Sequence, residues 1–195
     1  MTIQRFVLAI LIASTPLSAS IITYEAALSG ANENPATASL GTGFAVVTVD
    51  TIAQTMRVQV TFSGLTTGTT ASHIHCCIVS PGNAGVATTT PTFPGFPLTV
   101  TSGTYDQTFD MTLASSYNPT FVANNGGTAL AAEAVLFAGI AAGQSYLNIH
   151  TTMFPGGEIR GILAIPEPTT AGLAGFALAG LWFVRRRLVR PFPVP

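Results

Sequence analysis

Charged residues are scarce in this sequence, and lysine is absent altogether. Only 8% of the 195 residues are charged, whereas 48% are hydrophobic. Between residues 21 and 165, seven acids face only two bases, Arg57 and Arg160, which gives a formal net charge of −5. Proteins bind nucleic acids and anionic membrane surfaces through clusters of basic residues. The composition therefore predicts no nucleic-acid partner.

The sequence motifs of several large enzyme classes are also missing. We find no phosphate-binding loop, no glycine fingerprint for dinucleotides and no Gly-x-Ser-x-Gly nucleophile elbow. No two carboxylates are placed as a glycosidase requires. These absences favour a protein that is not an enzyme.

The N-terminus has the features of a secretory signal peptide, which we assign to residues 1–20. Arg5 supplies a short positive region, residues 6–13 an apolar region, and residues 18–20 are small. The apolar stretch is too short to span a membrane. We therefore expect export through the secretion translocon, rather than a buried N-terminal strand or helix.

The C-terminus carries a second apolar run, residues 171–184, followed at once by Arg185, Arg186 and Arg187. The run of 14 residues is shorter than the roughly 20 of an ordinary spanning helix. Arginines mark the cytoplasmic end of such helices. We predict a short transmembrane helix that serves as a transient anchor in the inner membrane; a permanent anchor is the alternative.

Pro166, Glu167 and Pro168, then the apolar run, then the arginine cluster resemble the PEP-CTERM sorting signal of Gram-negative bacteria. The resemblance covers residues 165–190, and residues 191–195 extend beyond it as a tail. It implies that an exosortase-type membrane transpeptidase recognises and removes the segment. It also implies that the protein goes to the cell surface or extracellular matrix.

Between the two ends, the sequence alternates as β-strands do. In residues 54–62, Met56, Val58, Val60 and Phe62 alternate with polar residues, which predicts one buried and one solvated face. Further strands are expected at 22–30, 41–50, 71–80, 99–113 and in a hairpin at 146–164. Short strands in this number predict an all-β domain over residues 21–164, a Greek-key-like β-sandwich of about 7–9 strands.

One helix is expected in this domain, at residues 128–140, which are rich in alanine and leucine. We predict that Leu130, Ala134 and Phe137 form its buried stripe.

Histidine occurs only three times, and all three positions are on expected strands. His73 and His75 are two residues apart, so a strand places both imidazoles on one face, about 6–7 Å apart. His150 lies on the hairpin, where Tyr146, Asn148 and His150 form one polar face. Three imidazoles suit copper or zinc. The alternative is a hydrogen-bonded, partly buried polar network without metal.

Cys76 and Cys77, the only cysteines, are adjacent. In an exported protein two cysteines suggest a disulfide. We favour a vicinal disulfide or a structural pair over catalysis; free thiols, thiolate ligands and a crosslink between chains remain open.

Glu158 and Arg160 share one face of the last expected strand. We predict a structural polar pair, an ion pair that fixes the strand. The alternative is a hydrogen-bonded triad with His150.

Several segments together resemble the CHRD domain, named from chordin. They are residues 24–33, 73–75, 148–151 and 155–161, and the resemblance spans residues 22–164. It implies a β-sandwich in an extracellular protein; in chordin the domain belongs to a growth-factor antagonist, and bacterial members have no settled activity. We therefore expect an exported structural or binding module.

An alternative function follows from the histidines. His73-Ile-His75 and the later Gly-Asn-Ala-Gly85 faintly resemble copper-zinc superoxide dismutase, which implies a metal-binding exported protein with redox chemistry of that kind. Extracellular polysaccharide is a further possible partner, through exposed aromatics such as Tyr105, Tyr117 and Phe121.

Overall fold

The computed structural model describes residues 21–166, and in this range the chain is mainly β. Seven antiparallel strands form one sheet in the order β4-β6-β7-β1-β2-β3-β5. The strands are β1 (Ile21–Ser29), β2 (Thr42–Asp50), β3 (Thr55–Ser63), β4 (Thr69–Cys76), β5 (Gly103–Asp110), β6 (Ser145–Thr151) and β7 (Ile159–Ile162). The helices are α1 (Pro119–Asn124) and α2 (Ala129–Ala141), with short 3-10 turns η1 (Gly30–Asn32) and η2 (Ala114–Ser116). The predicted mainly β class is confirmed.

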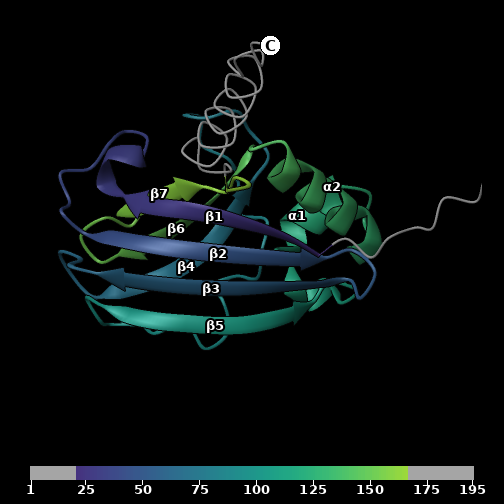
Figure 1. Cartoon of the computed structure of the whole chain (residues 1–195), viewed down its shortest axis with the longest axis horizontal. Helices are drawn as coiled ribbons and strands as arrows, with labels where there is room; N and C mark the ends of the chain where they lie inside the picture. The colour runs from purple at the N-terminus through teal and green to yellow at the C-terminus, as the bar shows by residue number, and fades with distance from the viewer. Residues whose placement is uncertain (1–20, 167–195) are drawn as a thin grey trace, which may run out of the picture.

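The sheet is one curled half-barrel, so the two layers expected of a sandwich are parts of a single continuous ladder. β3 and β4 occupy the sixth and first positions of the sheet, yet only residues 64–68 connect them. In a flat sheet these strands would lie about 24 Å apart, whereas the link reaches at most about 22 Å. The sheet must therefore curl, and Figure 1 shows β1, β2, β3 and β5 in front of β4 and β6.

The last strand of the domain, β7, fills the middle of the sheet. β7 lies between β6 and β1, and just beyond it Glu25 and Ala164 exchange both backbone hydrogen bonds, at 2.8 and 3.1 Å. The domain thus begins and ends on neighbouring strands.

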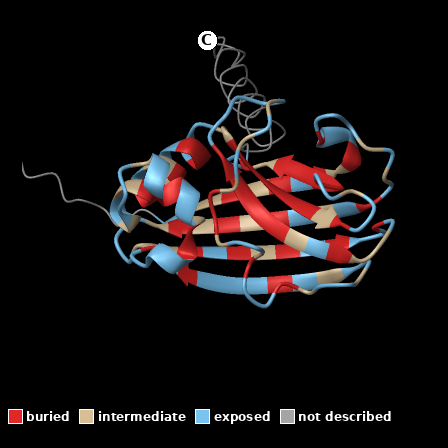
Figure 2. Ribbon diagram, turned by 180° about the vertical axis from the view of Figure 1, so that it is seen from behind, coloured by how far each residue is buried: buried red, intermediate tan, exposed pale blue. Residues whose placement is uncertain are grey.

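The core lies inside the curl. Met56, Val58, Val60 and Phe62 are all buried, as the alternation in β3 predicted. Figure 2, seen from behind, shows buried segments on the strands that enclose this interior. The loop between β4 and β5 also contributes, because Phe93 is fully buried and its amide donates to the carbonyl of Ser72 on the outer edge of β4. The loop therefore covers an edge that would otherwise be open.

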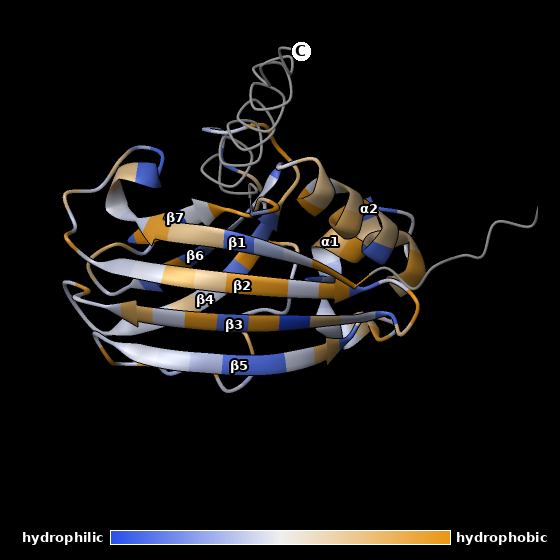
Figure 3. Ribbon diagram, viewed as in Figure 1, coloured by the Kyte–Doolittle hydropathy of each residue, from blue (hydrophilic) through white to orange (hydrophobic). Residues whose placement is uncertain are grey.

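Helix α2 forms where a helix was predicted, but the predicted buried stripe is wrong. Leu130 is 68% exposed and Ala134 is also exposed, whereas Ala132, Leu136 and Ile140 are buried. Of the three predicted residues only Phe137 packs against the core. The cause is the composition, since apolar residues occupy almost every position of α2 and Figure 3 colours most of it hydrophobic. A uniformly apolar helix has no periodicity from which a buried face can be read.

Several sequence predictions lie outside the described residues. They are the signal peptide at 1–20, the transmembrane helix at 171–184, the tail at 191–195, and the sorting-signal residues Glu167, Pro168, Arg185, Arg186 and Arg187. Within residues 21–166, no helix has the length and apolar character needed to cross a membrane.

Candidate metal centre

The three histidines meet on one face of the β4–β6 pair. The antiparallel register sets His73 opposite Asn148 and His75 opposite Tyr146, with His150 opposite Ala71. Because side chains alternate along a strand, these polar residues project on the same side. The rings of His73 and His75 lie 5.9 Å apart, and those of His73 and His150 5.2 Å apart. The structure therefore brings together all three predicted ligands.

The separations between the ring nitrogens approach those of a chelate. One nitrogen from each of His73, His75 and His150 lies within 4.8 Å of the other two. His73 Nδ1 and His150 Nε2 are 3.3 Å apart, which is close to the roughly 3.3 Å between two ligands of a tetrahedral ion with bonds near 2.0–2.1 Å.

Backbone carbonyls fix the tautomer of each ring. A carbonyl oxygen only accepts hydrogen bonds, so the nitrogen beside it carries the proton. These protonated nitrogens are His73 Nε2, His75 Nδ1 and His150 Nδ1, which donate to the carbonyls of Pro91, Ala84 and Pro155 at 2.6, 2.8 and 2.9 Å. In the neutral rings the remaining nitrogens therefore carry lone pairs. Two of them, His73 Nδ1 and His150 Nε2, face each other at 3.3 Å, and the third, His75 Nε2, is buried without a hydrogen-bond partner among the described residues.

Burial keeps the three imidazoles neutral. His73 and His75 are almost fully buried and His150 is partly buried. Burial lowers the pKa of His73 to about 4 and also lowers the pKa of His75 and of His150. A metal ion would therefore displace no protons from these ligands near neutral pH.

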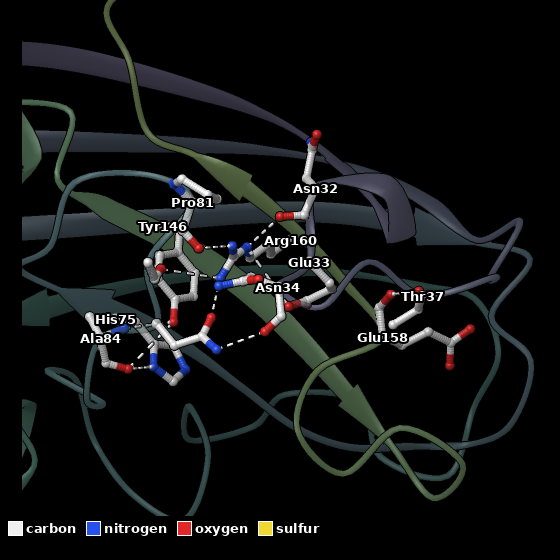
Figure 4. A network of polar contacts seen from close by, with 12 residues as sticks. Asn32, Glu33, Asn34, Thr37, His75, Pro81, Ala84, Tyr146, Glu158 and Arg160 are labelled. Atoms are coloured by element: carbon white, nitrogen blue, oxygen red, sulfur yellow. Dashed lines mark hydrogen bonds and ion pairs between the residues drawn. The ribbon is translucent and has the colours of Figure 1, made fainter.

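A second set of residues holds His75 in place. The ring of Tyr146 stacks on His75, with ring centroids 4.8 Å apart, and the guanidinium of Arg160 lies 4.6 Å from the Tyr146 centroid. Arg160 also donates to the side chain of Asn83 and the carbonyl of Pro81, both at 2.8 Å. Figure 4 shows this network reaching from Arg160 through Tyr146 to His75. Outer contacts of this kind orient metal ligands in known sites.

Glu33 and Asn148 belong to this network, and neither was singled out as a site residue from the sequence. Glu33 Oε2 lies 3.8 Å from the guanidinium of Arg160. Burial raises the pKa of Glu33 to about 7, although Arg160 and Asn148 oppose this shift. Glu33 Oε1 and Asn148 Oδ1 are buried without a hydrogen-bond partner among the described residues. The only indication in the sequence was the place of Glu33 in the segment 24–33 and of Asn148 in the polar face of the hairpin.

The predicted pair between Glu158 and Arg160 is not formed. Both residues are buried, but the carboxylate of Glu158 accepts hydrogen bonds from the hydroxyls of Ser39 and Thr151 and the amide of Thr66, each at 2.6 Å. Figure 4 shows Glu158 pointing away from Arg160. Glu158 precedes β7 and faces the segments beside β2 and β4, whereas Arg160 reaches Glu33. The alternative triad with His150 is therefore not formed either.

Cys76 and Cys77 are joined by a vicinal disulfide at the end of β4. Alternation along the strand directs Cys76 to the side opposite the histidines, where the disulfide packs against Gly139 of α2. A Cβ at Gly139 would collide with both sulfurs.

The aromatic residues proposed to bind polysaccharide are not exposed. Tyr105, Tyr117 and Phe121 are 7%, 2% and 8% exposed. Tyr105 lies on the buried face of β5 with Phe109, and the hydroxyl of Tyr117 donates to the carbonyl of Met111.

Two sequence families match the chain. The CHRD domain matches residues 24–163, and the PEP-CTERM protein-sorting motif matches residues 164–187. Both resemblances inferred from the sequence are thereby confirmed. No curated protein and no solved structure shows significant similarity. The sorting motif marks an exported protein that is processed by an exosortase-type system after transient membrane anchoring.

Proposed function

Because the chain belongs to the CHRD domain family and carries an exosortase-type sorting motif, we propose that it is an exported binding module that holds one copper or zinc ion. His73, His75 and His150 are the ligands. The observation that carries this proposal is a cluster of three imidazoles, each with one nitrogen within 4.8 Å of the other two. In every ring a backbone carbonyl holds the proton on one nitrogen and leaves a lone pair on the other.

A metal ion explains this arrangement better than a hydrogen-bonded network does. His73 Nδ1 and His150 Nε2 face each other at 3.3 Å, and two lone pairs at that distance form no hydrogen bond. A proton on either nitrogen would make an imidazolium, which the lowered pKa values of His73 and His150 oppose. A cation at the centre would satisfy all three nitrogens at once. Buried polar atoms without partners are costly, so this benefit is substantial.

Three neutral imidazoles leave a fourth coordination position open. Zinc and copper both accept such ligands. The open position would also admit a small ligand, which keeps superoxide-dismutase-like redox chemistry as a second candidate for a copper-loaded form. Within residues 21–166 the three histidines are the one cluster with enough ligands for a metal, so binding of a single ion is the simpler proposal.

The destination of the protein is part of the proposal. We place the sorted domain at the cell surface or in the extracellular matrix of a Gram-negative bacterium, as a structural or binding module.

Metal analysis of the full-length chain tests the proposal. The chain is purified in mild detergent, stripped with a chelator, reconstituted separately with Cu²⁺ and Zn²⁺, desalted and analysed by elemental mass spectrometry. We expect about one equivalent of one of these metals. His73→Ala and His150→Ala should each remove most of it, whereas Asp106→Asn, a change at an exposed carboxylate, should not.

Spectroscopy of the cobalt-substituted chain adds a readout of geometry. Strong visible bands of a four-coordinate site should be present in the parent and lost in His150→Ala. Less than about a tenth of an equivalent of both metals after reconstitution would refute the site, because an intact zinc centre holds its ion stoichiometrically.

A further inference from the structure

Two surface hollows meet at the vicinal disulfide. The first, which we call the amide hollow, has a volume of about 340 Å³ and is lined by both cysteines, Phe121, Val135 and three asparagines. The second, which we call the alanine hollow, has a volume of about 470 Å³ and is lined by Cys77, Val135, Ala134 and Ala138, among others. Cys77 and Val135 line both hollows and form the ridge between them. Their volumes fall in the range of small-molecule sites.

The amide hollow offers both donors and acceptors. Asn118 uses its side-chain oxygen to cap α1 at Thr120, so its NH₂ group remains available. Asn125 uses its NH₂ group on the carbonyl of Phe121, so its side-chain oxygen remains available. Asn124, which is exposed, forms no side-chain hydrogen bond among the described residues. The hollow therefore presents a mixed set of neutral donors and acceptors.

The chemistry of the lining limits the ligand. No acidic or basic side chain lines either hollow, so phosphates, carboxylates and ammonium groups would find no counter-charge. Hydroxyl groups both donate and accept hydrogen bonds, which matches the asparagine set. The sulfurs, Val135 and the alanines provide an apolar surface beside it, suited to the C–H faces of sugar rings. Ligand sites commonly combine such apolar walls with a few placed polar groups.

We infer that the two hollows form one binding site for a neutral oligosaccharide. The asparagines of the amide hollow bond to the hydroxyls of one sugar unit, and the ridge of Cys77 and Val135 supports the chain as it crosses into the alanine hollow. The site lies beside α1 and α2 and shares no residue with the trihistidine cluster, so it does not depend on the metal proposal. Export brings this surface into contact with extracellular glycans.

Binding to defined oligosaccharides tests the inference. Glucose, cellobiose and cellotetraose, the corresponding series of mannose oligomers, and tetragalacturonate as a charged comparison are titrated into the full-length chain by calorimetry. We expect at least one neutral series to bind, with affinity rising with chain length because a longer ligand crosses the ridge. Tetragalacturonate should bind at least about tenfold more weakly than the preferred neutral tetramer.

Substitutions on the surface of α1 and α2 locate the site. Asn124→Ala in the amide hollow and Ala134→Glu in the alanine hollow should each weaken binding of the tetramer at least about tenfold. Leu130→Glu changes an exposed position one turn before Ala134 on the same helix, and Gln107→Ala removes an exposed amide from β5. These two controls should bind as the parent does, and circular dichroism confirms that all four variants are folded.

Three outcomes would overturn the inference. One is the absence of binding to every neutral oligomer, and another is tighter binding of tetragalacturonate. The third is neutral binding that Asn124→Ala and Ala134→Glu leave unchanged.

Discussion

Replacing Glu33 by glutamine should increase the loss of folding stability that the protein undergoes when the pH falls. Two buried groups of opposite behaviour lie near the candidate metal centre. The pKa of His73 is lowered from 6.5 to about 4, and that of Glu33 is raised from 4.5 to about 7. Stability changes with pH wherever the folded and unfolded states bind different numbers of protons.

The two groups contribute with opposite signs. Between pH 6.5 and 4 the unfolded chain takes up a proton at His73 that the folded state refuses, so acid destabilises the fold. Between pH 7 and 4.5 the folded state takes up a proton at Glu33 that the unfolded chain does not yet bind, so acid stabilises the fold. Each shift amounts to roughly 3 kcal/mol at about 1.36 kcal/mol per pH unit. In the metal-free parent the contributions of His73 and Glu33 nearly cancel. The lowered pKa values of His75 and His150 act in the same direction as that of His73, so acid still destabilises the parent.

Urea unfolding of the chelator-treated full chain at about pH 7 and about pH 4.5 measures the effect. Glu33→Gln should lose roughly 3 kcal/mol more of its free energy of unfolding between these pH values than the parent loses. The variant also loses the ion pair with Arg160, so it is the difference between the two pH values that matters and not the stability at either one. Asp106→Asn is the control, because Arg57 lowers the pKa of that exposed carboxyl and it titrates below this range. Equal losses in parent and Glu33→Gln would show that Glu33 binds no proton in this range.

Two further predictions concern packing. Gly157→Ala should destabilise the fold by about 2 kcal/mol or more in thermal unfolding, because Gly157 has φ +129° and a Cβ would collide with the side chains of Glu33 and Asn148. Gly156→Ala is the control: no atom lies within 4 Å of its added Cβ, so its stability should change by no more than about 0.5 kcal/mol in the same assay. Leu147→Ala removes a fully buried side chain from β6 and should cost about 2–5 kcal/mol, whereas Leu40→Ala, at a position 93% exposed, should be nearly neutral in urea unfolding; a similar loss in both would contradict the assigned core.

Alternation along single strands was enough to predict most of the sheet. In β3 the apolar residues Met56 to Phe62 are buried and their neighbours face solvent, because one side of that strand is open. The same alternation occurs in the strands of a sandwich and of a half-barrel, so it could not distinguish them. The short link 64–68 between β3 and β4 carries that information, but only once the order of the strands is known.

The site was harder to predict because distant segments cover it. In β6 both faces are largely buried, including the polar face with Tyr146 and Asn148. The cover comes from the end of η1, from the loop after β4 and from the turn before β7. Glu33 directly follows η1, and the loop and the turn supply Ala84 and Pro155. The spacing of His73 and His75 predicted that the two rings lie together. The partner of Arg160 is Glu33, which comes from a distant part of the chain, and no local sequence pattern indicates that pairing.

The position of β7 in the sheet has a mechanical consequence. Tension applied to the chain beyond Ile165 would first pull on the paired backbones of Glu25 and Ala164, and then on β7. Because β7 is bonded along both edges, to β6 and to β1, removing it from the sheet breaks hydrogen bonds to two neighbouring strands. A domain held by this end at a surface is therefore loaded near the centre of its sheet and not at an edge strand.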